Sequence, residues 1–211
     1  MLTCIIQVIF LLVYHLVTCY FLFRSILFLI LNHLQEFFMI LTSNTFTHQL
    51  IEQTVKINDI VLDGTTANGI NTRFLATRVG NAGKVLSYAT TKDNANAAAA
   101  SLFMSGLSDR VTLLGKTLDD QFINELGSQN QISVAIFDYS DDAKNVNDRP
   151  ANYLQQISYV LPRLTHGGLL IVKFEQVPEA WHEYKNNLLE ADYSQASYIT
   201  RFVQTDVIER I

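Results

Sequence analysis

The side chains best placed for chemistry in this chain lie between Ile60 and Gly69. The segment reads Ile-Val-Leu-Asp-Gly-Thr-Thr-Ala-Asn-Gly, and a predicted helix follows it. An apolar run that ends in Asp63 is typical of a buried parallel strand, and open α/β sheets bind ligands outside the carboxyl ends of such strands. Gly64 and Gly69 would let the backbone approach a ligand closely or take a positive φ. We therefore expect a pocket with the Asp63 carboxylate at its rim, with an ordinary ligand-free loop as the alternative.

Several other kinds of site are excluded or disfavoured. The loop lacks the Gly-Lys-Ser/Thr of a P-loop, and its glycine spacing differs from the dinucleotide fingerprint. Residues 39–211 contain no cysteine, which excludes disulfides and thiolate metal sites there and fits a reducing cytosol. His48, His166 and His182 are too scattered for a metal motif, so we expect no metal. The net charge of −5, with dispersed basic residues, argues against a strongly basic nucleic-acid platform, and any RNA contact would need a local patch.

Composition divides the chain near residue 38. From Met1 to Gln35 the only charged side chain is Arg24, and the apolar run 2–23 is long enough to cross a bilayer. We favour the interpretation that residues 1–38 are upstream sequence read from an early start codon, with the protein beginning at Met39. A transmembrane anchor is a close second interpretation. A signal peptide and a buried core helix fit less well, because the run has no basic n-region and no polar face.

Residues 39–211 are expected to form one domain in which strands and helices alternate. Strands are predicted at 59–63, 84–88, 110–114, 132–138, 168–174, 197–204 and 206–211. Helices are predicted at 43–55, 71–79, 93–105, 118–126, 151–160 and 179–190. Alternation of this kind indicates a parallel sheet with helices on both faces. The last two strands have almost no connection, so they should pair as an antiparallel hairpin. The predicted fold is an α/β, Rossmann-like, seven-stranded, mostly parallel sheet.

The segment 58–76 resembles a family of small bacterial class I methyltransferases. These were long called rRNA methylases and are now linked to methylation of the 5-aminomethyl group on the wobble 2-thiouridine of tRNA. The family pattern is Asp-Ala-Thr-x-Gly-Asn-Gly-x-Asp-Thr, followed by Phe-Leu-Ala. The resemblance continues through 106–113 and 167–172 and covers most of residues 40–211. The matching residues in the first motif are Asp63, Thr65, Asn68, Gly69, Thr72, Phe74, Leu75 and Ala76.

The resemblance implies a cytoplasmic enzyme that transfers a methyl group from S-adenosyl-L-methionine (SAM) to tRNA. It leaves open a homodimer and, if residues 1–38 are translated, a membrane anchor. Asp138, which ends the fourth predicted strand, is the candidate for orienting the acceptor amine, with a helix N-cap or a solvated carboxylate as the alternative. The expected cofactor contacts are Asp63, Gly64, Thr65, Asn68, Gly69, Thr72, Tyr88 and Asp93. Alternative roles are a helix cap for Thr72 and a core side chain for Tyr88.

Departures from the family pattern fall on the rim of the expected site. Ala67 replaces a family glycine, and Asn71 replaces a family aspartate. The acid that normally holds the ribose falls on Ala89, for which Asp93 could compensate only through a shifted loop. The residues 173–176 replace a Tyr-His-Gly-His segment, and the residues 138–142 replace a glycine-containing loop. These departures affect the cofactor and substrate rim, whereas the apolar framework of the fold is kept. The alternative function is therefore a non-catalytic protein with this fold, or a membrane-anchored form of it.

Overall fold

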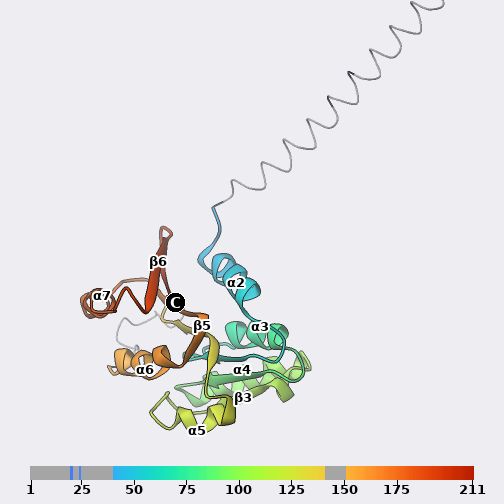
Figure 1. Ribbon diagram of the computed structural model, residues 1–211. Helices are drawn as coiled ribbons and strands as arrows, with labels where there is room; N and C mark the ends of the chain where they lie inside the picture. The colour runs from blue at the N-terminus through green and yellow to red at the C-terminus, as the bar shows by residue number, and fades with distance from the viewer. Residues whose placement is uncertain (1–19, 21–23, 25–39, 141–150) are drawn as a thin grey trace, which may run out of the picture. The chain divides into compact units, whose positions relative to one another are not determined.

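The computed structural model describes Tyr20, Arg24 and the ranges 40–140 and 151–211 (Figure 1). The chain divides into two units, Met1–Leu41 and Thr42–Ile211. Nearly all of the predicted leader, 1–38, lies outside the described residues. Within the described ranges, no helix combines the length and the apolar character needed to cross a membrane.

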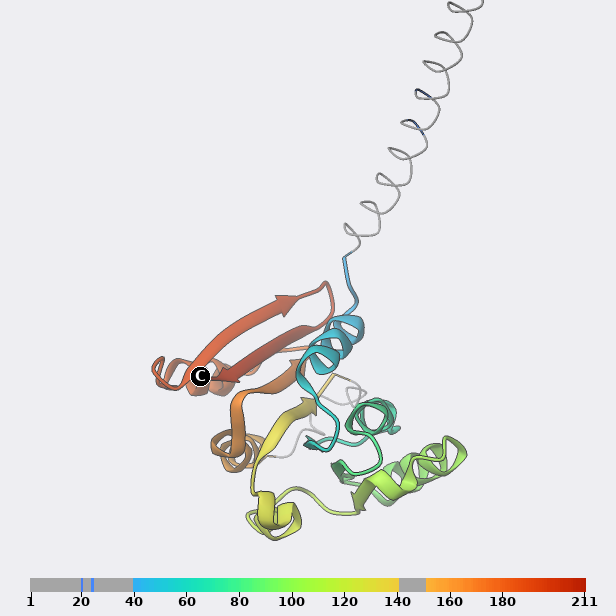
Figure 2. The same ribbon diagram turned by 45° about the vertical axis from the view of Figure 1, so that its right-hand side comes forward.

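Within the described part of the unit Thr42–Ile211, seven strands form one sheet in the order β3-β2-β1-β4-β5-β7-β6. The first five strands are parallel, and β7 runs antiparallel to both β5 and β6 (Figure 2). This confirms the predicted α/β sheet with its C-terminal antiparallel hairpin. The strands are β1 Ile60–Asp63, β2 Lys84–Tyr88, β3 Val111–Leu114, β4 Ile132–Asp138, β5 Leu164–Phe174, β6 Tyr193–Ile199 and β7 Gln204–Arg210.

Helices cover both faces of the sheet. They are α2 Ser43–Thr54, α3 Ile70–Val79, α4 Lys92–Met104, α5 Phe122–Leu126, α6 Tyr153–Val160 and α7 Glu179–Asn186, with short 3-10 turns at Ser108–Arg110, Gly127–Gln129 and Leu161–Arg163. Side chains alternate along each strand. Val61 therefore packs in one apolar core with residues of α2, α3 and α4, while Leu62 packs in the other with residues of α5, α6 and α7.

The two central strands read as continuous apolar runs because both of their faces are covered. All four residues of β1 and all seven of β4 are buried. Each of these strands ends in an aspartate at the carboxyl edge of the sheet. Asp63 lies in register with Ile136 of β4, and Asp138 lies in register with Lys173 of β5. The sheet thus brings two buried acids and a buried lysine to one edge.

The structure corrects the predicted boundaries of the hairpin. The turn lies between β6 and β7 at 200–203, where the hydroxyl of Thr200 donates to the carbonyl of Val203 at 2.9 Å and accepts its N–H at 3.0 Å. The sequence had suggested a break at Thr205, next to the charged Asp206. Both residues are instead buried within β7.

A polar network explains how Asp206 is accommodated inside the sheet. Its carboxylate accepts hydrogen bonds from the Trp181 indole at 2.7 Å and the Lys185 ammonium at 2.8 Å, and from Ser197 and Gln204. Burial alone would raise the pKa of Asp206, but these donors outweigh it and lower the pKa below its ordinary value. One carboxylate therefore joins α7, β6 and β7.

Candidate functional site

Asp63 ends β1 with its carboxylate almost fully enclosed, at 1% exposure. Its Oδ1 accepts the backbone N–H of Thr65 at 3.2 Å, and its Oδ2 accepts the hydroxyl of Thr72 at 2.6 Å. Burial raises the pKa of Asp63 to about 6, and the nearby charge of Asp138 adds to the rise, while the two hydrogen bonds oppose it. A cationic group beside Asp63 would favour the charged carboxylate.

The loop from Gly64 to Gly69 carries the chain from β1 into α3. A Cβ atom on Gly64 would lie 2.2 Å from Cε1 of Phe137, so only glycine fits there. Gly69 has φ +80° at the start of α3, a conformation that glycine adopts without strain. Asn68 Oδ1 accepts the N–H of Ile70 at 3.1 Å. The loop therefore ends at a helix N-terminus, where the helix dipole favours anionic ligands.

A small, open pocket lies at this edge. Both acidic strand ends, Asp63 of β1 and Asp138 of β4, line it. These two strands are neighbours, and the strand order reverses between them, which is where open α/β sheets bind ligands. The remaining lining residues are Thr65, Ala67, Asn68, Gly69, Ile70 and Asn71. Two carboxylates and a helix N-terminus suit a ligand that carries both positive and negative groups.

The carboxylate of Asp138 is only 2% exposed and holds four hydrogen bonds. Its Oδ1 accepts from the backbone N–H and the hydroxyl of Ser140, at 3.1 and 2.6 Å. Its Oδ2 accepts from the amide of Asn71 at 3.2 Å and from the ammonium of Lys173. The backbone N–H of Asp138 donates to Thr65 Oγ1 at 2.6 Å, which ties the end of β4 to the glycine loop.

Lys173 connects this pocket to helix α2. Its side chain is 2% exposed, and its ammonium forms an ion pair with Asp138 and donates to Asn44 Oδ1 at 2.6 Å. His48 lies one turn further along α2 and stacks on Phe74 of α3, with ring centroids 3.7 Å apart. Burial lowers the pKa of His48, and the positive charge of Lys173 lowers it further.

The sequence did not single out this second group, which consists of Asn44, His48 and Lys173. Lys173 stood out only as a departure from the family pattern, and its pairing with Asp138 depends on the register of β4 and β5. Asn44 and His48 are four residues apart and so share one face of α2, which is the signal that could have found them.

The pocket unites five of the nine predicted site residues: Asp63, Thr65, Asn68, Gly69 and Asp138. Two others support it from behind. Thr72 is fully buried and holds the Asp63 carboxylate, and Gly64 is buried against Phe137.

Tyr88 and Asp93 do not line this pocket. Tyr88 is fully buried in the core shared with α5, and its hydroxyl donates to Glu125. Burial, aided by the charge of Glu125, raises the pKa of Tyr88. Asp93 is exposed in the first turn of α4. Ala89, where the family carries its acid, is fully buried.

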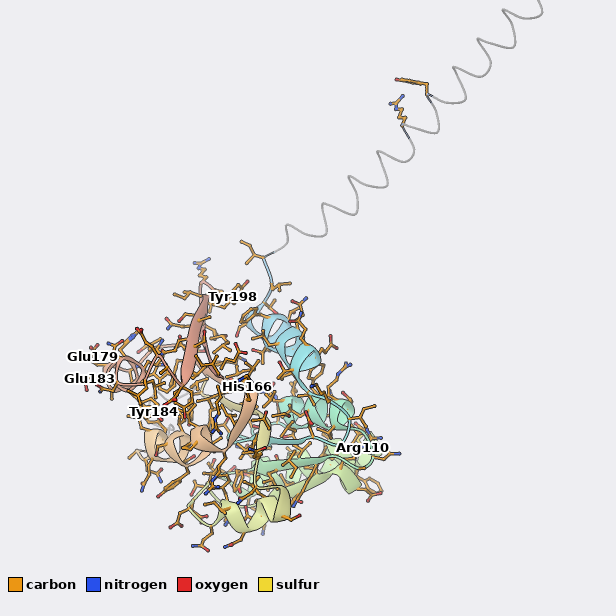
Figure 3. All side chains as sticks on the ribbon, in the orientation of Figure 1. Arg110, His166, Glu179, Glu183, Tyr184 and Tyr198 are labelled. Atoms are coloured by element: carbon orange, nitrogen blue, oxygen red, sulfur yellow. The ribbon has the colours of Figure 1, made fainter. Side chains whose placement is uncertain are left out.

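The remaining conspicuous side chains lie elsewhere (Figure 3). His166 is exposed in the first half of β5, which begins at Leu164 rather than at the predicted residue 168. Tyr184 of α7 stacks on the buried Trp181, with ring centroids 5.6 Å apart, so this pair packs the helix onto the sheet. Among the described residues, no group of three or more His, Cys, Asp or Glu side chains could hold a metal ion.

Comparisons with known proteins bear on this arrangement. No protein-family model matches the chain, and no curated protein matches its sequence. Solved structures do match. A protein provisionally named an rRNA methylase from Clostridium thermocellum has a TM-score of 0.73 and 22% identity, over 82% of this chain and 100% of the other.

The chain has a methyltransferase fold. An rRNA methylase from Streptococcus thermophilus matches with a TM-score of 0.68 and 21% identity, over 82% of this chain and 99% of the other. A protein provisionally named a methyltransferase from Streptococcus mutans, solved in complex with SAH, matches with a TM-score of 0.69 and 24% identity, over 82% of this chain and 100% of the other. At these identities the likeness establishes the methyltransferase fold, and the activity has to be argued from the site.

Proposed function

We propose that this chain is a SAM-dependent methyltransferase that acts on RNA in the cytoplasm. The finer proposal is that the acceptor is the 5-aminomethyl group on the wobble 2-thiouridine of tRNA, as the sequence resemblance implies. The observation that carries the proposal is the pocket between β1 and β4, where Asp63, Asp138 and the N-terminus of α3 meet.

The residues of this pocket fit the methionine end of SAM. That end carries a carboxylate, an ammonium and a sulfonium. The positive end of the α3 dipole suits the carboxylate, and the carboxylate of Asp63 suits the ammonium. When bound, SAM supplies an electrophilic methyl group. The chain contributes orientation and charge complementarity, which is most of what such a transfer requires.

The ribose end fits less well. Ala89 offers no carboxylate for the ribose hydroxyls, and Asp93 is exposed on α4. This favours weak SAM binding. It is also the observation behind the second candidate function, a protein that keeps the methyltransferase fold without catalysis.

The RNA substrate is supported by the names of the similar structures, two of which are called rRNA methylases. The formal net charge of −5 means that contact with RNA relies on a local patch rather than on the whole surface. A homodimer would be one way to extend such a patch.

Calorimetric titration of the full-length chain with SAM tests the cofactor proposal. We expect binding, and we expect Asp63→Ala to abolish it, because the cationic end of the ligand loses its carboxylate. Asp109→Ala, which changes an exposed acid outside the pocket, is the matched control and should bind like the wild type. No binding by the wild type at millimolar SAM would leave the non-catalytic function standing.

Transfer of tritiated methyl from SAM to unfractionated tRNA tests the acceptor. Nucleoside analysis should place the label on the wobble 2-thiouridine derivative. Label on rRNA instead would keep the RNA methyltransferase and reject the wobble acceptor.

A further inference from the structure

His48 has a ring nitrogen whose hydrogen-bonding capacity is unused. Its Nε2 is buried and has no hydrogen-bond partner among the described residues. An unsatisfied buried polar atom costs about 1–3 kcal/mol, so its presence calls for an explanation. Stacking on Phe74 explains where the ring lies, but not why a polar ring occupies that place.

Asp138 lacks the spare capacity that His48 has. A carboxylate offers about four lone-pair positions. Four hydrogen bonds, two from Ser140, one from Asn71 and one from Lys173, already reach the two oxygens of Asp138. Because Lys173 is also paired with this carboxylate, Asp138 is poorly placed to accept a proton from another group. An incoming amine could bind it only by replacing one of the four donors.

Asn71 is the donor most easily replaced. Its hydrogen bond to Asp138 Oδ2 is the longest of those with a stated length, at 3.2 Å. Asn71 is partly exposed and lines the pocket. Phe74, on which His48 stacks, lies one turn further along α3 and shares a face of the helix with Asn71. The amide of Asn71 therefore bonds Asp138 from the part of α3 that packs against His48, next to the cofactor site.

We propose that the acceptor amine takes the place of the Asn71 amide, so that Asp138 orients the amine and His48 Nε2 removes its proton. This inference rests on the proposed function. The acceptor ammonium gives one proton to Nε2, and the freed nitrogen lone pair forms the new N–C bond. The C–S bond of the sulfonium breaks, and sulfur keeps that electron pair. The product is a methylated ammonium, and His48 returns its proton to solvent.

The surroundings of His48 keep it neutral and ready to accept a proton. Burial is the main cause of its lowered pKa, and the positive charges of Lys173 and Arg78 lower it further. Glu52 on the same helix and the Asn71 side chain act in the opposite direction. Asp138, which is paired with Lys173, and Asp63 are further titratable groups that line the pocket beside Asn71.

The test compares two variants of the full-length protein, with tritiated SAM and unfractionated tRNA as substrates. His48→Phe keeps the aromatic stack on Phe74 but has no nitrogen, and His48→Gln keeps polarity without titrating. We expect both to lower kcat by about 10²–10⁴-fold, the usual contribution of general acid–base catalysis, with SAM affinity unchanged. The wild-type rate should fall on acidification at a pH below 6.5, because the pKa of His48 is lowered from that ordinary value. The variants should lack that dependence.

His182→Phe, on the exposed surface of α7, is the matched control and should behave like the wild type. A purely packing role for His48 would leave His48→Phe with a normal rate and a normal pH profile, and that result overturns the inference. If one variant fails to melt cooperatively, the other decides the question. A wild type that binds SAM but methylates no RNA defeats the proposed function and this inference together. A wild type that methylates RNA at the same rate as both variants defeats this inference alone.

Discussion

Asp138 and Lys173 occupy the same register position on β4 and β5, and their side chains form an ion pair with only 2% of each exposed. A buried pair of this kind gains little over a well-packed apolar pair, yet removal of one partner leaves an unpaired buried charge. Its position beside the pocket indicates that the charges serve the site more than the stability of the sheet.

Lys173→Met should lower the free energy of unfolding by about 3–5 kcal/mol, because Asp138 is left charged and unpaired in the interior. Urea unfolding at pH 7 measures the loss. Arg78→Met is the matched control, since its ion pair with Glu52 is exposed and should be worth about 1 kcal/mol or less. The double change Asp138→Asn with Lys173→Met should recover part of the stability. Equal losses for Lys173→Met and Arg78→Met would contradict this account.

Asp63→Asn should stabilise the protein at neutral pH. The pKa of Asp63 is raised in the folded state from 3.8 to about 6, so the folded state favours the protonated form. The contribution of the Asp63 carboxyl to the stability of the folded state is most favourable below pH 3.8 and is lost as the pH rises through about 6. The stability of Asp63→Asn relative to the wild type should therefore rise by about 2 kcal/mol between pH 4 and pH 7.5. Urea titrations at both values measure it, with Asp109→Asn as an exposed control, and a pH-independent difference would refute it.

SAM affinity should respond to the ribose end of the pocket. A carboxylate that accepts hydrogen bonds from two ribose hydroxyls is worth about 1.5–3 kcal/mol, or roughly tenfold to a hundredfold in affinity. Ala89→Asp should tighten SAM binding by that factor, although Ala89 is buried and the loop after β2 must open to admit the larger side chain. Calorimetry measures the change. If Ala89→Asp leaves SAM affinity unchanged and Asp93→Ala abolishes SAM binding, then Asp93 rather than residue 89 binds the ribose hydroxyls.

The range 39–211 should fold alone, because every described strand and the helices α2 to α7 lie within it. A protein beginning at Met39 should be soluble and should melt in a single cooperative transition by circular dichroism. Insolubility, or the absence of a cooperative melt, would show that residues 1–38 contribute to the fold. The intact mass of the native protein would show separately whether those residues are present in the cell.

Much of the fold could be predicted because the central strands β1 and β4 are continuous apolar runs that end in acids. β2 and β4 have the predicted bounds, and β1 differs from its prediction by one residue. The hairpin turn was predicted at residue 205 but lies at 200–203. Thr205 and Asp206 are buried within β7, and Asp206 is held there by donors on α7 and β6 that are distant in the sequence.

Part of the candidate site was predictable because its residues are close together in the sequence. Asp63, Asn68 and Gly69 belong to one continuous loop, so a local pattern could reveal them. The contacts of Lys173 with Asp138 and Asn44 join three separate elements, and they depend on strand register and on where α2 lies. No spacing within the sequence encodes such contacts.

The network around Asp206 has a consequence for how the protein opens. Trp181 and Lys185 of α7, Ser197 of β6 and Gln204 of β7 all donate to this one carboxylate. The helix and the hairpin cannot separate without leaving that buried acid short of donors. Their backbone amides should therefore exchange with deuterium as a single unit, with one shared opening free energy, rather than fraying strand by strand from the edge of the sheet.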